Sequence, residues 1–180
     1  MKKLLFLCTA VLLSCSADDE SVTQEEVNLL IDHYKTTSLF YGTALVAYEN
    51  GSSISIEIPA IAGFEFEQRN TYDITTSKKT TKNSGTNATT VSYELLSVVA
   101  QDSVPASTRF AMPLAKFVNG LGYVKFVVGN AETGYIISNE ITMDCTYFCS
   151  ELYSRLSIED NITGEFEHGP EGTYVLMALY

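Results

Sequence analysis

Apolar and polar side chains alternate along several short segments of this chain, and a two-residue period predicts β-strands with one buried face. The segment 53–58 alternates isoleucine with polar residues directly after the dipeptide Asn50-Gly51, which is typical of a tight hairpin turn. A second alternating segment covers 123–128, and the run 174–180 is apolar on both faces, as expected for a well-covered final strand. The pattern therefore predicts a mainly antiparallel sheet.

A different period begins near residue 24, where apolar residues stand three and four positions apart and predict an N-terminal helix over 24–36. Thr23 and Glu26 fit a capping box at its start. His33 falls off the apolar stripe, so we expect it on the surface. We expect the stripe to pack on the sheet of the same domain, although a partner-binding helix would carry the same pattern. The stripe consists of Val27, Leu30, Ile31 and Tyr34.

A second, shorter helix is predicted over 146–156, after Asp144 as a capping residue. Phe148, Leu152 and Leu156 would share one apolar face of it. Together these elements predict an α+β fold in which antiparallel sheet dominates, with an N-terminal helix and one short later helix.

The first fifteen residues have a different order of charged and apolar residues from the rest of the chain. Lys2 and Lys3 precede the apolar run 4–13, which has the length of a secretory signal and is too short to span a bilayer as a helix. Ser14-Cys15 closes the run, and the segment resembles the lipobox of bacterial lipoproteins. That resemblance implies cleavage after residue 14 and lipid attachment at Cys15. An ordinary signal peptide with a chance cysteine, or a buried N-terminal strand, would be the alternatives.

Three acidic residues follow the cysteine, and Asp18, Asp19 and Glu20 resemble the export signal of Bacteroidetes surface lipoproteins. The resemblance implies an outer-membrane protein displayed on the outer face. A solvated acidic linker would have the same composition. We therefore expect a signal peptide at 1–14, an acidic tether at 15–22 and one β-rich domain at 23–180, or two small halves that meet near 105.

Charge limits the partners of this domain. The 180 residues carry a formal net charge of −11, and binding to nucleic acid requires clustered Lys and Arg. We expect no nucleic acid, and membrane attachment through acylated Cys15. Lys78, Lys79 and Lys82 form a local positive group in a polar hairpin, which could meet an envelope protein or glycan, or could only be solvated.

Two cysteines remain in the expected mature chain, Cys145 and Cys149. In an oxidising envelope such a pair is expected to form a disulfide rather than a zinc site, which needs four ligands. His33 and His168 are the only histidines and neither lies in a recognisable catalytic motif, so we expect no catalytic site, no metal and no cofactor. A carboxylate pair for sugar cleavage and a loose calcium site stay open as alternatives.

A hydrophobic pattern covers residues 61–104 and consists of Ile61, Gly63, Phe64, Phe66, Glu67, Tyr72, Ile74, Tyr93, Leu95 and Val98. This pattern resembles a small uncharacterised domain that accompanies META (HslJ-like) domains in bacterial envelope lipoproteins. The resemblance implies a fold element and a location, since that domain has no established activity. The chain lacks the upstream cysteine pair of that family, and its Pro-rich hairpin is replaced by residues 82–87.

Within the same segment, Asp102-Ser103-Val104 matches the short pattern on which Bacteroidetes envelope proteins are O-glycosylated, so Ser103 is a candidate site, although three residues also match by chance. From all these features we expect a lipid-anchored binding or structural module of the cell envelope. A small envelope hydrolase or inhibitor is the alternative.

Overall fold

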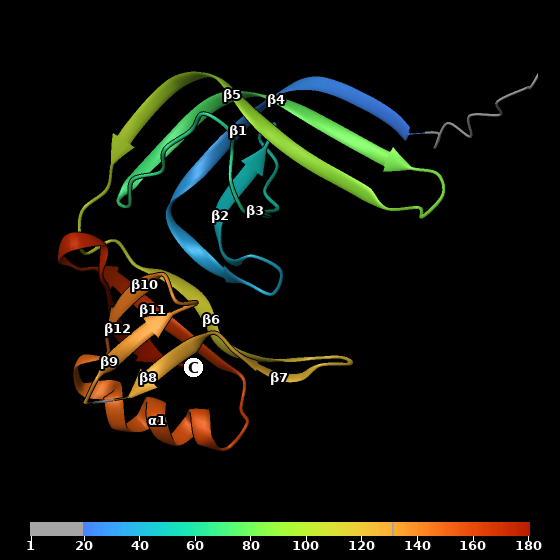
Figure 1. The fold of residues 1–180 in the computed structure, drawn as a ribbon. Coiled ribbons are helices and arrows are strands. Elements are labelled where there is room, and N and C mark those ends of the chain that lie inside the picture. The colour runs from blue at the N-terminus through green and yellow to red at the C-terminus, as the bar shows by residue number, and fades with distance from the viewer. Residues whose placement is uncertain (1–19, 131) are drawn as a thin grey trace, which may run out of the picture.

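The computed structural model describes residues 20–130 and 132–180. The predicted signal peptide, the lipid-attachment residue Cys15 and the acidic residues Asp18 and Asp19 lie outside these ranges. The described residues form two β-sheets, one above the other in Figure 1, and the chain passes from the first sheet to the second at residues 104–109. None of the helices among the described residues has the length and apolar character needed to cross a membrane.

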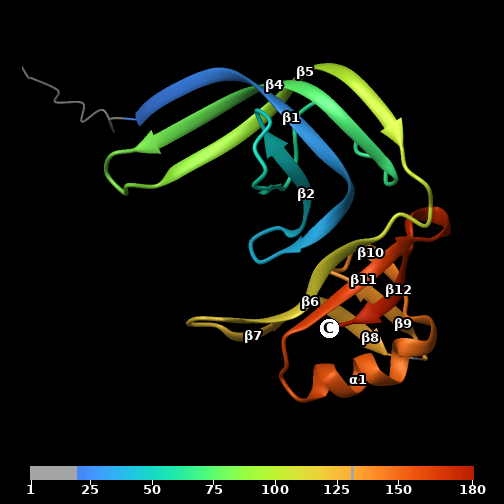
Figure 2. The same ribbon diagram turned by 180° about the vertical axis from the view of Figure 1, so that it is seen from behind.

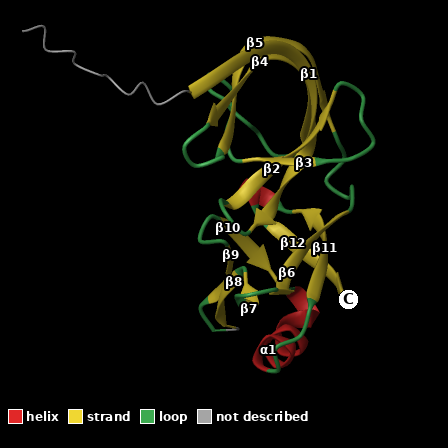
Figure 3. Ribbon diagram, turned by 90° about the vertical axis from the view of Figure 1, so that its right-hand side faces the viewer, coloured by secondary structure: helices red, strands yellow, loops and turns green. Residues whose placement is uncertain are grey.

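The N-terminal sheet is built from five strands in the order β3-β2-β1-β4-β5, and every neighbouring pair is antiparallel. Three long strands, β5, β4 and β1, arch over the shorter strands and loops, so the sheet is strongly curved when seen from the side (Figure 3). The strands are β1 (Glu20–Ser38), β2 (Gly42–Glu49), β3 (Ile56–Ile58), β4 (Asn70–Asn83) and β5 (Thr89–Ser103).

The predicted N-terminal helix is wrong, because residues 20–38 form β1. Val27, Leu29 and Ile31 point into the core at alternate positions, while Leu30 is 51% exposed. The sequence around residues 27–34 has adjacent apolar residues, so a helical and a strand period both fit it. Pairing with β4 and β2 decided between them, since packing against neighbours outweighs local preference. Residues 20–22 of the predicted acidic tether belong to β1, since Glu20 already pairs with Asn83.

The C-terminal sheet has seven strands in the order β7-β6-β11-β12-β10-β9-β8, antiparallel except for the pair β10 and β12. The final strand lies at the centre of this sheet, as its two apolar faces predict. The strands are β6 (Phe110–Val118), β7 (Gly122–Lys125), β8 (Val127–Asn130), β9 (Gly134–Ile137), β10 (Ile141–Asp144), β11 (Ile162–His168) and β12 (Tyr174–Leu179).

The later helix is confirmed as α1 (Cys149–Ser157), preceded by a 3-10 turn at Thr146–Phe148. It lies at the end of the C-terminal sheet that is farther from the N-terminal sheet (Figure 2). Leu152 is fully buried, and Phe148 and Leu156 pack against the same core, as the predicted apolar face requires. A second 3-10 turn, Pro170–Gly172, joins β11 to β12.

Each sheet has its own apolar core, and polar contacts join the two sheets. The backbone N–H of Lys35 donates to the Tyr174 hydroxyl at 2.9 Å, and the Thr37 hydroxyl donates to the Pro113 carbonyl at 2.7 Å. The Glu140 carboxylate accepts from both Lys35 and the Thr43 hydroxyl. The end of β1 therefore fixes the N-terminal sheet onto the C-terminal one.

Candidate functional site

The N-terminal sheet curves until its edge strand β5 meets the chain that follows β3. Ala62 closes the contact: its N–H donates to the Tyr93 carbonyl and its carbonyl accepts from the Leu95 N–H, each at 2.9 Å. This is an isolated parallel bridge, so contact through the backbone is made at one residue only. We call the gap between the edge of β5 and the segment 54–67 the seam. The Ala62 bridge divides the seam into two openings.

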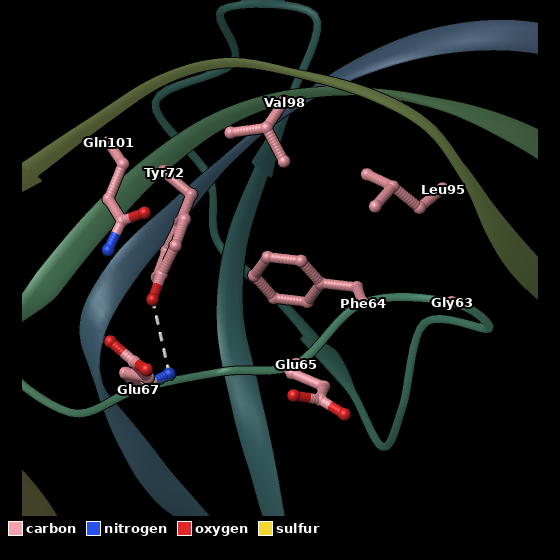
Figure 4. Close-up of a pocket in the computed structure, with 8 residues that line it drawn as sticks. All are labelled: Gly63, Phe64, Glu65, Glu67, Tyr72, Leu95, Val98 and Gln101. Carbon is pink, nitrogen blue, oxygen red and sulfur yellow. Dashed lines mark hydrogen bonds between the residues drawn. The ribbon is translucent and has the colours of Figure 1, made fainter.

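The first opening, the proximal pocket, is a cavity of about 540 Å³ (Figure 4). Phe64 projects from the loop into it, toward Val98 on β5. The Phe64 ring meets Tyr72 edge to face at 4.9 Å, and the Tyr72 hydroxyl accepts from the Glu67 N–H at 3.2 Å. These contacts fix the loop beneath β5. The lining residues are Gly63, Phe64, Glu65, Glu67, Tyr72, Leu95, Val98 and Gln101.

Two carboxylates lie on the loop side of the proximal pocket. Glu65 and Glu67 are both exposed. Glu67 accepts a long hydrogen bond from the Asn70 amide at 3.4 Å, and the Glu65 carboxylate has no hydrogen-bond or ion-pair partner within 20–130 and 132–180. The pocket thus combines an aromatic and aliphatic interior with a negative rim, and a free carboxylate is available to a cationic group.

The second opening, the distal pocket, is a cavity of about 730 Å³ between residues 52–60 and residues 89–93. Lys78 lies at its base, where its ammonium donates to both oxygens of Glu49 at 2.8 and 2.9 Å. The Tyr93 hydroxyl donates to the same carboxylate at 3.0 Å. Burial, and then the Glu49 carboxylate, raise the pKa of Tyr93, so the hydroxyl keeps its proton and remains a donor.

This network changes the interpretation of the predicted lysine group. Lys78 points into the concave side of the sheet and is neutralised by Glu49, with Glu25 at 3.7 Å. Lys79 and Lys82 remain exposed on the hairpin. The three lysines therefore do not act as one positive surface.

The structure also brings the two histidines together. His33 Nδ1 and His168 Nε2 are 2.8 Å apart, and both residues are buried, so the predicted surface position of His33 is wrong. The register of β1 against β2 slips between Ile31 and Lys35, and this bulge directs His33 toward the C-terminal sheet. Neither histidine lines the proximal or the distal pocket.

Burial lowers the pKa of both histidines. The pKa of His168 falls to about 4, since burial disfavours its charge and the nearby His33 and Arg69 add to the effect. For His33 the nearby Asp32, whose carboxylate is 3.5 Å from Nε2, opposes the lowering. His168 Nδ1 is buried without a hydrogen-bond partner among the described residues. The pair therefore acts as a neutral contact between the two sheets.

The other predicted positions are separate from the seam pockets. Cys145 and Cys149 form a disulfide that spans the 3-10 turn, from the residue before it to the first residue of α1. Ser103 is exposed at the end of β5, and its hydroxyl donates to the Asn70 side chain at 2.6 Å.

The sequence did not predict the seam as a site. The available signal was the apolar run around Leu95–Val99 in a strand without Lys, Arg or Pro.

Comparison of the chain with known protein families, with curated proteins and with solved structures finds no match.

Proposed function

We propose that this chain is a lipid-anchored binding module of the bacterial cell envelope, held in the outer membrane by acylated Cys15 and facing outward. The lysine, apolar and cysteine order of residues 1–15 supports the anchor. The seam supports the binding role, and it is the single observation on which that role rests. The two pockets lie on either side of the Ala62 bridge, which is the one backbone contact that the described residues make across the seam. β5 borders both pockets, and its Val98 side chain is half-exposed.

The resemblance at 61–104 supports the same location. Its residues gather at one place in the fold, since Phe64, Tyr72, Leu95 and Val98 line the proximal pocket and Ile74 lies in the core beneath it.

Catalysis is less well supported than binding. A hydrolase needs a positioned acid, base or nucleophile that its substrate can reach. His33 and His168 face each other in a buried contact. The groups that line the proximal pocket combine aromatic and aliphatic side chains with carboxylates at the rim, an arrangement that suits recognition of a ligand.

Photo-crosslinking in cells tests the binding site. A photoreactive residue at position 98 should yield an adduct with an envelope component, because Val98 lines the proximal pocket. The matched control is position 96. Leu96 is 52% exposed, close to the 49% of Val98, but lines a different hollow with Gln24, Glu26 and Ser77. Equal adducts from both positions, or adducts from position 96 alone, would remove the seam from the proposal.

Cell fractionation tests the anchor. Cys15→Ser should abolish labelling by radioactive palmitate and release the protein from the membrane fraction, because two or more acyl chains are needed for stable attachment. Alanine in place of Asp18, Asp19 and Glu20 should leave labelling intact and reduce digestion by protease added to whole cells. Undiminished palmitate labelling of Cys15→Ser would contradict the lipobox, and unchanged digestion would contradict the export signal.

A further inference from the structure

We propose that the proximal half of the seam binds an extended peptide, which pairs as an added strand with the free edge of β5 and presents apolar and basic side chains. This inference rests on the binding role proposed above and names the class of ligand. It is carried by the backbone of β5, by the pocket beside it and by the charge of the rim.

The backbone of β5 has groups directed toward the seam. The Tyr93 carbonyl and the Leu95 N–H bond to Ala62, so these residues direct their polar groups away from β4. Leu95, Val98 and Gln101 pair with Thr76, Ile74 and Tyr72, which are alternate residues of β4. Alternate residues of a strand share one direction, so the N–H and C=O groups of Val98 and Gln101 also point to the free edge.

The edge is open for most of its length and is poorly protected. β5 has 15 residues, and its sequence contains no Lys, Arg or Pro, the residues that usually block edge pairing. Two bulges at Leu96 and Val99 are the only irregularities in its pairing with β4. Ala62 shows that one residue of extended chain already forms two backbone hydrogen bonds with this edge. Residues 98–103, beyond the bulge at Leu96, offer the same kind of edge to a partner.

The side chains beside this edge define the ligand further. Val98 and Gln101 point their side chains into the proximal pocket, next to Phe64 and Tyr72 (Figure 4), so an added strand would place an apolar side chain there. The rim of the proximal pocket carries Glu65 and Glu67 from the loop, and Asp102 lies near the end of β5. Because this chain carries a net charge of −11, a partner of complementary charge is basic.

The probe is an acetylated, amidated heptapeptide, Lys-Thr-Val-Thr-Val-Thr-Lys, whose lysines and valines share one face. Calorimetry should show binding, and hydrogen exchange should slow at the amides of Val98 and Gln101. Two further versions of the peptide separate backbone pairing from side-chain contact. One is methylated at the backbone nitrogens of the valines, and the other at the backbone nitrogens of the threonines. Only one set of N–H groups can face β5, so one version should bind about tenfold more weakly while the other stays within about threefold.

Two protein variants complete the test. Val98→Lys should weaken binding of the heptapeptide about tenfold or more, because it places a cation in the pocket that receives an apolar side chain, whereas Leu96→Lys, with the same charge change outside the pocket, should stay within about threefold. Absence of probe binding, equal weakening by both N-methylated versions, or equal weakening by both variants would overturn the inference.

Three further results would also overturn it. One is equal binding of a peptide with Glu in place of Lys. Another is a dimer that Val98→Lys dissociates, since the occupant would then be a second copy of the chain. The third is a position-98 adduct in cells together with no probe binding, which would leave the binding module intact and remove only the peptide.

Discussion

At the scale of single residues, the position of a side chain in the fold decides its role, and residue type alone did not indicate that role for Lys78. Lys78 looked like part of a charged hairpin, yet its side chain is only 19% exposed and is bound by both oxygens of Glu49. Lys79, the next residue, faces solvent. Adjacent residues of a strand point to opposite faces of the sheet, so these two neighbouring lysine side chains lie in different environments.

The difference between these lysines can be measured. Lys78→Met should lower the free energy of unfolding by about 1 to 3 kcal/mol, because it leaves the Glu49 carboxylate half-buried without its cation. Lys79→Met should change that free energy by less than about 0.5 kcal/mol, as for most exposed positions. Urea unfolding of both variants gives the comparison. Equal losses would mean that the Glu49 contact contributes nothing specific.

At the scale of elements, β1 and α1 show when a sequence period can be trusted. The period of α1 was unambiguous, and the disulfide from Cys145 to Cys149, the first residue of the helix, adds a local constraint of roughly 2 kcal/mol in the chain-entropy model. The segment that became β1 contained both periods. Its 19 residues pair along β4 and β2, which are distant in sequence, and that pairing could not be read from the segment itself.

At the scale of the whole molecule, the two sheets meet at a small group of buried rings. His33 from β1 and His168 from β11 form the central contact, and Tyr34 stacks on Phe110 of β6 at 4.6 Å beside it. Asp32 and Arg69 are the charged groups nearest to the pair. Stability of the junction therefore depends on keeping both imidazoles neutral.

This junction predicts a pH dependence. The pKa of His168 is about 4 in the fold and near 6.5 in an unfolded chain, so unfolding takes up a proton between these values. Its contribution is fully present above pH 6.5 and is lost as pH falls toward 4, by on the order of 3 kcal/mol. His168→Asn should flatten the wild-type dependence over this window.

Urea unfolding at pH 7, 5.5 and 4.5 measures the effect as a difference between the wild type and the variant, which removes the common contribution of the many carboxylates. His33→Asn should also reduce the slope, since the pKa of His33 is lowered as well. An identical slope in wild type and both variants would show that the pair is not neutral in the fold.

The sequence by itself determined the β-rich class, the turn at Asn50-Gly51, a short helix predicted at 146–156 and found at 149–157, the central final strand and the pairing of two cysteines. These depend on local periods and on close spacing, which neighbouring residues set. Tertiary structure alone decided that residues 20–38 form a strand, that His33 meets His168 and that β5 faces a seam. Each of these joins residues far apart in the chain, 135 positions apart for the histidines. Such contacts arise from the packing of one sheet edge against another segment, and no local pattern contains that information.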